Sequence, residues 1–239
     1  MLAQEKPLFQ PKANSETFRN LKTQALADLT PNQIGYLRDR AIIQSIVELG
    51  ALDTNQVRLL HCPGKAGMRK AQDRLRKLYI HKALNRVPRA INQAYVYYIP
   101  PKKPQNLDHL IMLNWVYIYL LKTFNQVELW VREYQGWHSF GVQPDALAKI
   151  NGLYYAIEVD RAESRNHFDK AEKYNRLYSE HGERVMELLN NPPKFPRIII
   201  VTTDVKRKEK IEQLISGNNP HSLKYMVKTL DSIVRECQP

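Results

Sequence analysis

Apolar residues recur every three or four positions in three segments of the first hundred residues, which is the spacing of amphipathic helices. Thr30-Pro31 predicts the start of the first helix, because threonine caps a first turn and proline tolerates the first helical position. The predicted helices cover about residues 31–50, 53–63 and 66–81. Two short alternating segments, 83–87 and 94–99, then predict a hairpin. Three helices followed by a hairpin are typical of a winged helix-turn-helix.

The pattern changes at a proline-rich stretch, residues 100–105, which predicts a stiff linker. Residues 108–124 are apolar nearly all round, as in a helix buried under a sheet. Alternation then predicts three strands, the last two joined by the hairpin turn Asn151-Gly152. These strands cover residues 126–134, 142–150 and 153–159. The remaining predicted elements are a helix, a strand, a helix and a last strand or helix, over residues 166–180, 197–204, 206–216 and 223–234.

The order of these elements predicts a mixed α/β (α+β) protein. Helix, three strands, helix and strand is the order of the restriction-endonuclease-like core, and it follows the winged-helix pattern along the chain. We therefore expect an N-terminal arm, a winged helix-turn-helix domain, a linker and a nuclease-like domain, over residues 1–30, 31–99, 100–105 and 106–239.

Acidic side chains gather at the ends of the predicted hairpin strands. Pro144-Asp145 opens the first strand, and Glu158 and Asp160 share one face of the second. Acids at the end of an apolar strand must be paired, hydrated or bound to a metal. The arrangement resembles the PD-(D/E)XK nuclease motif, and this resemblance implies that Asp145 and Glu158 hold Mg²⁺, with Mn²⁺ as a substitute. Mg²⁺ keeps several waters, so two acids leave positions open for a phosphate.

The sequence departs from that motif at Asp160, which stands where the nucleases have a lysine. The following helix presents Lys170, Lys173 and Tyr174 at helical spacing, so that all three can face the strand ends. The spacing of Lys170 and Tyr174 resembles the Gln-x-x-x-Tyr box of some nucleases. We therefore include Asp160, Lys170, Lys173 and Tyr174 among the candidate catalytic residues, with a solvated helix face as the alternative. His109 is interpreted as a structural histidine.

Positive charge is concentrated in one part of the chain. The formal net charge is +12, and residues 31–104 hold an excess of ten, with fourteen Lys and Arg against four acids. Such a local excess is the footprint of a polyanion partner, and a winged helix places its third helix in the major groove of double-stranded DNA. The expected DNA-binding residues lie on the third helix and the hairpin: Arg69, Lys70, Arg74, Lys77, Lys82, Arg86 and Arg89. A winged helix that docks onto protein is the alternative.

Composition also bears on the cellular compartment and on which structural sites the protein can contain. Two cysteines, Cys62 and Cys237, are too few for a disulfide framework or a cysteine-based zinc site, which fits a reducing cytoplasm. The N-terminal residues lack the apolar core of a signal peptide, and the longest apolar run, residues 110–121, is too short to span a bilayer. We therefore expect a cytoplasmic protein with no membrane segment.

The whole pattern resembles the replication-relaxation family of plasmid and mobile-element proteins over about residues 31–205. The resemblance rests on the order of the modules together with Pro144-Asp145, Glu158-x-Asp160 and Lys170-x-x-x-Tyr174. It implies a role in plasmid replication and DNA relaxation, with replication or relaxation proteins as further partners. In that family the Glu-x-Asp is similar to the one here, so Asp160 fits the resemblance.

Two functions stay open at this point. The first is a metal-dependent DNA endonuclease, which uses the acids and a displaced lysine. The second is a non-catalytic DNA-binding regulator or replication accessory protein, whose nuclease-like domain forms a homodimer or docks onto other proteins. The absence of a lysine at position 160 favours the second.

Overall fold

The computed structural model describes residues 30–88, 93–161 and 168–238. Most of the predicted arm and the hairpin residue Arg89 lie outside these ranges. The structure has the mixed α/β composition expected from the sequence, with a three-stranded and a five-stranded sheet in its described ranges. Within those ranges no helix is both long enough and apolar enough to cross a membrane. The two cysteines are buried and not disulfide-bonded.

The N-terminal segment, residues 30–99, contains the three predicted helices. They are α3 (Pro31–Leu49), α4 (Thr54–His61) and α5 (Gly67–Ile80). Thr30 caps α3 and Asp53 caps α4, and in each case a glutamine three residues later returns a hydrogen bond to the cap backbone. In α5, Ala71, Leu75 and Leu78 form the buried stripe. The starts of α3 and α4 were therefore predictable from local capping chemistry, whereas α5 follows Ala66, which provides no side-chain cap.

A small antiparallel sheet follows these helices in the fold. Its strands, in the order β1-β3-β2, are β1 (Leu52–Asp53), β3 (Val96–Tyr98) and β2 (Asn85–Val87). The hairpin of β2 and β3 was predicted, whereas β1 was not. Two residues are too short for an alternating pattern, and β1 exists only because Leu52 and Asp53 pair with Tyr97 and Val96.

The C-terminal segment, residues 106–238, is built on the five-stranded sheet. Its strands, in spatial order, are β4 (Leu129–Arg132), β5 (Ala146–Ile150), β6 (Leu153–Asp160), β7 (Arg197–Thr202) and β8 (Tyr225–Thr229). Strand β5 pairs antiparallel with both β4 and β6, whereas β7 pairs parallel with β6 and β8 pairs parallel with β7. The last predicted element, a strand or a helix, is both, because β8 passes directly into α9 (Leu230–Cys237).

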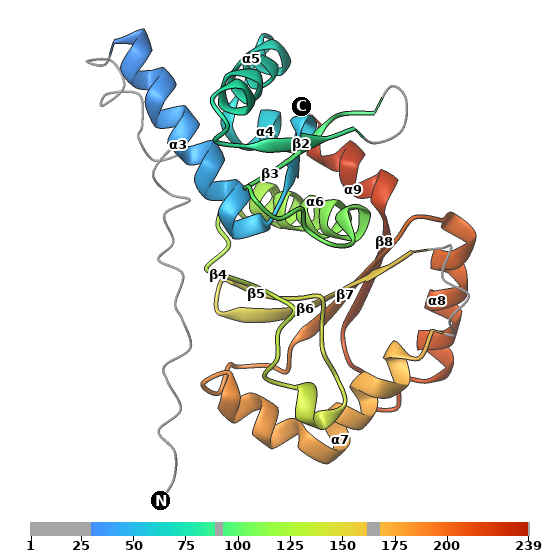
Figure 1. The fold of residues 1–239 in the computed structure, drawn as a ribbon. Helices are drawn as coiled ribbons and strands as arrows, with labels where there is room; N and C mark the ends of the chain where they lie inside the picture. The colour runs from blue at the N-terminus through green and yellow to red at the C-terminus, as the bar shows by residue number, and fades with distance from the viewer. Residues whose placement is uncertain (1–29, 89–92, 162–167, 239) are drawn as a thin grey trace, which may run out of the picture.

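Helices cover both faces of this sheet (Figure 1). One face packs against α6 (Leu107–Phe124) and α9, and it carries Tyr155, Ile157 and Val159 of β6. The other face packs against α7 (Lys170–Leu188) and α8 (Val205–Gly217), and it carries Tyr154 and Ala156 of β6. Strand alternation therefore points Glu158 toward the side of α7.

Helix α6 joins the two segments. Twelve of its residues are buried, and its core cluster continues from the N-terminal helices to the five-stranded sheet. The buried Asn114 side chain donates to the backbone oxygens of Leu49 and Ala51, and the buried Gln56 side chain donates to the oxygen of Ile111. The predicted linker lies between the two sheets in sequence, but apolar packing crosses from one segment to the other through α6.

Candidate functional site

The register of β5 and β6 brings two of the predicted acids together. Ala146 of β5 pairs with Ile157 of β6, so Asp145 and Glu158 are neighbours where the ladder ends. Asp145 Oδ2 accepts a hydrogen bond of 2.7 Å from the backbone N–H of Val159. The turn of the predicted hairpin fixes this register, which is why both acids could be placed from sequence.

Glu158 is the centre of the site. Its side chain is 2% exposed, and each carboxylate oxygen has a partner from α7. Lys170 Nζ lies 2.8 Å from Oε2, and the Tyr174 hydroxyl donates to Oε1 over 2.8 Å. Lys170 and Tyr174 lie four residues apart on α7, so both extend from one face of the helix. Of the three side chains predicted to face the strand ends, Lys170 and Tyr174 therefore meet Glu158, whereas Lys173 does not.

The charges at this site are set by burial and by each other. Desolvation raises the pKa of Glu158 to about 7, against the lowering effect of Lys170 and with added repulsion from Asp145. Burial alone lowers the pKa of Lys170, but attraction to Glu158 outweighs it, so the net pKa is raised and the ammonium persists. Burial and the carboxylate of Glu158 raise the pKa of Tyr174, which stays a neutral hydrogen-bond donor.

His109 is a site residue that the sequence analysis set aside as structural. Its Nε2 lies 3.2 Å from Asp145 Oδ1, and the pKa of His109 is raised chiefly by this hydrogen bond. Nearby Arg161 opposes that rise. The contact joins the first turn of α6 to the start of β5. A local sequence pattern cannot predict a contact between two residues so far apart in the chain.

Two of the predicted catalytic residues, Asp160 and Lys173, form ion pairs with residues other than Glu158. Asp160 accepts two hydrogen bonds from the Arg207 guanidinium, of 2.8 and 3.0 Å, and so ties β6 to the first turn of α8. Lys173 lies 2.7 Å from Asp169, one turn earlier along the chain. Among the described residues, neither forms a hydrogen bond or ion pair with Glu158. The sequence left two lysines as candidates, and Lys170 is the one that lies beside Glu158.

The donor set is compatible with a divalent cation of the hard, oxygen-preferring kind. The described residues contain no cluster of three or more His, Cys, Asp or Glu able to hold a metal. Asp145 and Glu158 supply two carboxylates, and each oxygen with one partner keeps a further lone pair for a cation. Burial is the main cause of the raised pKa of Glu158, and a cation would offset both this desolvation and the smaller repulsion from Asp145. Mg²⁺ needs few protein ligands because it retains several waters.

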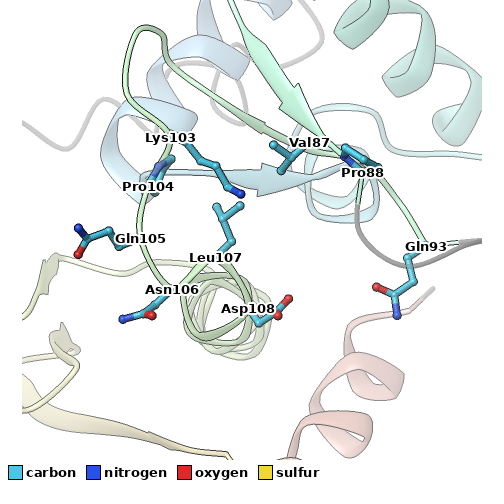
Figure 2. Close-up of a pocket in the computed structure, with 9 residues that line it drawn as sticks. All are labelled: Val87, Pro88, Gln93, Lys103, Pro104, Gln105, Asn106, Leu107 and Asp108. Atoms are coloured by element: carbon cyan, nitrogen blue, oxygen red, sulfur yellow. The ribbon is translucent and has the colours of Figure 1, made fainter.

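A cavity of about 830 Å³ lies between the β2–β3 hairpin and the start of α6 (Figure 2). Its lining is mostly polar and comes from both segments: Val87, Pro88, Gln93, Lys103, Pro104, Gln105, Asn106, Leu107 and Asp108. Asp108 precedes His109 in α6, but neither Asp145 nor Glu158 lines the cavity. The cavity is therefore a neighbour of the acidic site and not part of it.

The predicted DNA-binding residues divide into two groups. Arg69, Lys70, Lys77 and Lys82 are exposed at or just beyond α5. Arg74 is half-buried and is engaged by Asp39 and by the backbone oxygen of Gly35, so it joins α5 to α3 instead of facing outward. Arg86 is half-buried among tyrosines, and Arg89 lies outside the described residues.

Replacing Arg74 with methionine should lower the free energy of unfolding by about 1 to 2 kcal/mol, because a half-buried charged pair with additional backbone bonding is lost. Urea denaturation measures this change. Arg76→Met, on the exposed face of the same helix, is the matched control and should change stability by less than about 0.5 kcal/mol. An equal effect of the two substitutions would show that the Asp39 contact contributes nothing.

Comparison with known proteins gives no assignment. No protein-family model, no curated protein and no solved structure matches this chain. The function is therefore argued from the residues and their geometry.

Proposed function

We propose that this chain is a DNA-binding protein of a plasmid or mobile element, acting in replication or DNA relaxation, whose C-terminal segment cleaves DNA with Mg²⁺. The observation that carries the proposal is the meeting of Asp145 and Glu158 on adjacent strands, with Lys170 bonded to Glu158. Purified protein incubated with supercoiled plasmid and Mg²⁺ should produce nicked or linear DNA. Unchanged plasmid at high protein concentration would contradict the nuclease assignment.

The element order supports the finer fold assignment within this proposal. Three helices and a small sheet with a β2–β3 hairpin support a winged helix-turn-helix in the N-terminal segment. Helix α6, strands β4 to β6, helix α7 and strand β7 follow the element order expected of a restriction-endonuclease-like domain, which supports that assignment for the C-terminal segment. In such a domain, acids at the ends of adjacent strands are the expected place for phosphodiester chemistry.

Each site residue has a separate task in this proposal. Asp145 and Glu158 would hold Mg²⁺, which when bound polarises a phosphate oxygen and acidifies water. Lys170 keeps a positive charge beside the carboxylates and can bind a phosphate oxygen. Tyr174 fixes the orientation of Glu158, whereas the Val159 N–H and His109 fix that of Asp145. The hydrogen bond of its hydroxyl thus assigns Tyr174 to the Glu158 carboxylate.

Duplex binding by the basic face of α5 can be tested separately from cleavage. Replacing Arg69, Lys70 or Lys77 with alanine should weaken duplex binding and reduce the slope of log affinity against log salt by about one unit each. Fluorescence anisotropy at several salt concentrations measures both. Lys210→Ala, an exposed lysine on α8, is the matched control and should leave the slope unchanged. Equal slopes for all four variants and the wild type would assign the basic face to another role.

A non-catalytic regulator remains the second candidate, and one observation favours it. Glu158 is already neutralised by Lys170, so the buried carboxylate is satisfied without a metal. In this case the plasmid stays intact with Mg²⁺ or Mn²⁺, while the duplex still binds through the basic face.

A further inference from the structure

Two exposed tyrosines lie beside one arginine of the β2–β3 hairpin. Tyr79, near the end of α5, is 38% exposed, and Tyr95, just before β3, is 42% exposed. The Arg86 guanidinium carbon lies over both rings, 4.3 Å from the centroid of Tyr79 and 4.4 Å from that of Tyr95. Three consecutive parts of the chain, α5, β2 and the residue before β3, therefore place two aromatic rings around a single cation.

The arginine holds the rings and leaves part of each ring accessible. The guanidinium lies over one face of each ring, and both tyrosines nevertheless stay more than a third exposed. Arg86 also has a hydrogen bond with the buried Tyr97, which fixes the guanidinium against β3. A ring held on one side by a fixed cation is a rigid surface for stacking on the other side.

The charge around these rings favours a polyanion. In the described part of the chain Arg86 has no carboxylate partner. Desolvation lowers its pKa, but the hydrogen bond with Tyr97 and the neighbouring tyrosines together outweigh it, so the net pKa is raised. Lys77, His81 and Lys82 are exposed nearby in sequence. Exposed aromatic rings among cations are the arrangement that binds unpaired nucleobases, since every base has a face that stacks and every phosphate carries a charge.

We propose that Tyr79 and Tyr95 stack unpaired bases, so that the N-terminal segment binds single-stranded DNA in addition to duplex. This inference rests on the proposed DNA-binding function and extends it to a second form of DNA. A strand opened next to the duplex site would then be held beside the β2–β3 hairpin, through its bases at the tyrosines and through its phosphates at the neighbouring cations.

The test compares two labelled probes by fluorescence anisotropy: an oligothymidine of about fifteen nucleotides and a duplex of about twenty base pairs. Tyr79→Ala and Tyr95→Ala should each weaken binding of the single strand about ten-fold, with little change for the duplex. Tyr95→Phe keeps the ring and should bind like the wild type. Tyr178→Ala is the matched control, because Tyr178 is 40% exposed on α7 in the other segment.

Circular dichroism checks that each variant folds. If Tyr79→Ala or Tyr95→Ala does not fold, the inference is tested with Tyr95→Leu, which keeps much of the side-chain bulk without the ring. Duplex binding with an unaltered single-strand affinity in the tyrosine variants would overturn this inference alone and leave the rings for a protein partner. An equal loss in Tyr178→Ala would overturn it as well. Binding of neither probe by the wild type would overturn the proposed function together with the inference.

Discussion

Asp145→Asn and Glu158→Gln are each expected to abolish magnesium-dependent cleavage of supercoiled plasmid, with a loss of at least about a thousand-fold in rate. Both substitutions keep the shape of the side chain and remove the negative charge that a divalent cation requires. Duplex affinity should stay at the wild-type value, because the basic face of α5 lies in the other segment. The rate is followed as the appearance of nicked and linear DNA with Mg²⁺ or Mn²⁺.

Asp160→Asn is the matched control for these two variants. Asp160 lies on the same strand as Glu158 and is also acidic, but its carboxylate is bonded to Arg207. It should cleave within about three-fold of the wild type and lose only about 1 kcal/mol of stability. Equal cleavage by wild type, Asp145→Asn and Glu158→Gln would remove the enzyme assignment and leave the non-catalytic regulator.

Much of the fold is local in origin, and that part could be predicted. Alternation in β6 separates Tyr155 and Ile157 from Tyr154 and Ala156, and the two sets do pack against different helices. The same rule placed Glu158 on the side of α7, and the turn Asn151-Gly152 fixed the register that brings Asp145 beside it. Strand period and turn type together were sufficient to place both acids.

The missed contacts join residues that are distant in sequence. The pairs Asp39–Arg74, His109–Asp145 and Asp160–Arg207 each connect two different elements. Helical spacing put Lys170 and Lys173 equally close to the strand ends, and only packing separates them, because Lys173 turns to Asp169. Sequence patterns assign a side chain to a face of an element, but the partner across that face depends on tertiary geometry.

Lys170→Met is expected to destabilise the protein in a strongly pH-dependent way when measured in EDTA. Glu158 has a folded pKa raised to about 7 from an ordinary 4.5, so its contribution is most favourable below pH 4.5 and is lost as the pH rises to about 7. Without the Lys170 cation the folded pKa of Glu158 rises further, and the loss continues above pH 7. The variant should therefore lose less than about 1 kcal/mol at pH 5 and about 2 to 4 kcal/mol at pH 8.5, since an unpaired buried carboxylate remains.

Thermal and urea denaturation across this pH range measure the difference between variant and wild type. Lys173→Met is the matched control, because Lys173 lies on the same helix but pairs with the exposed Asp169, and its effect should be small and independent of pH. The double variant Lys170→Met/Glu158→Gln should lose the pH dependence, since the titrating carboxyl is gone. A constant difference between Lys170→Met and the wild type from pH 5 to 8.5 would mean that Lys170 does not stabilise the Glu158 carboxylate, and the charge arrangement proposed for the site would then be wrong.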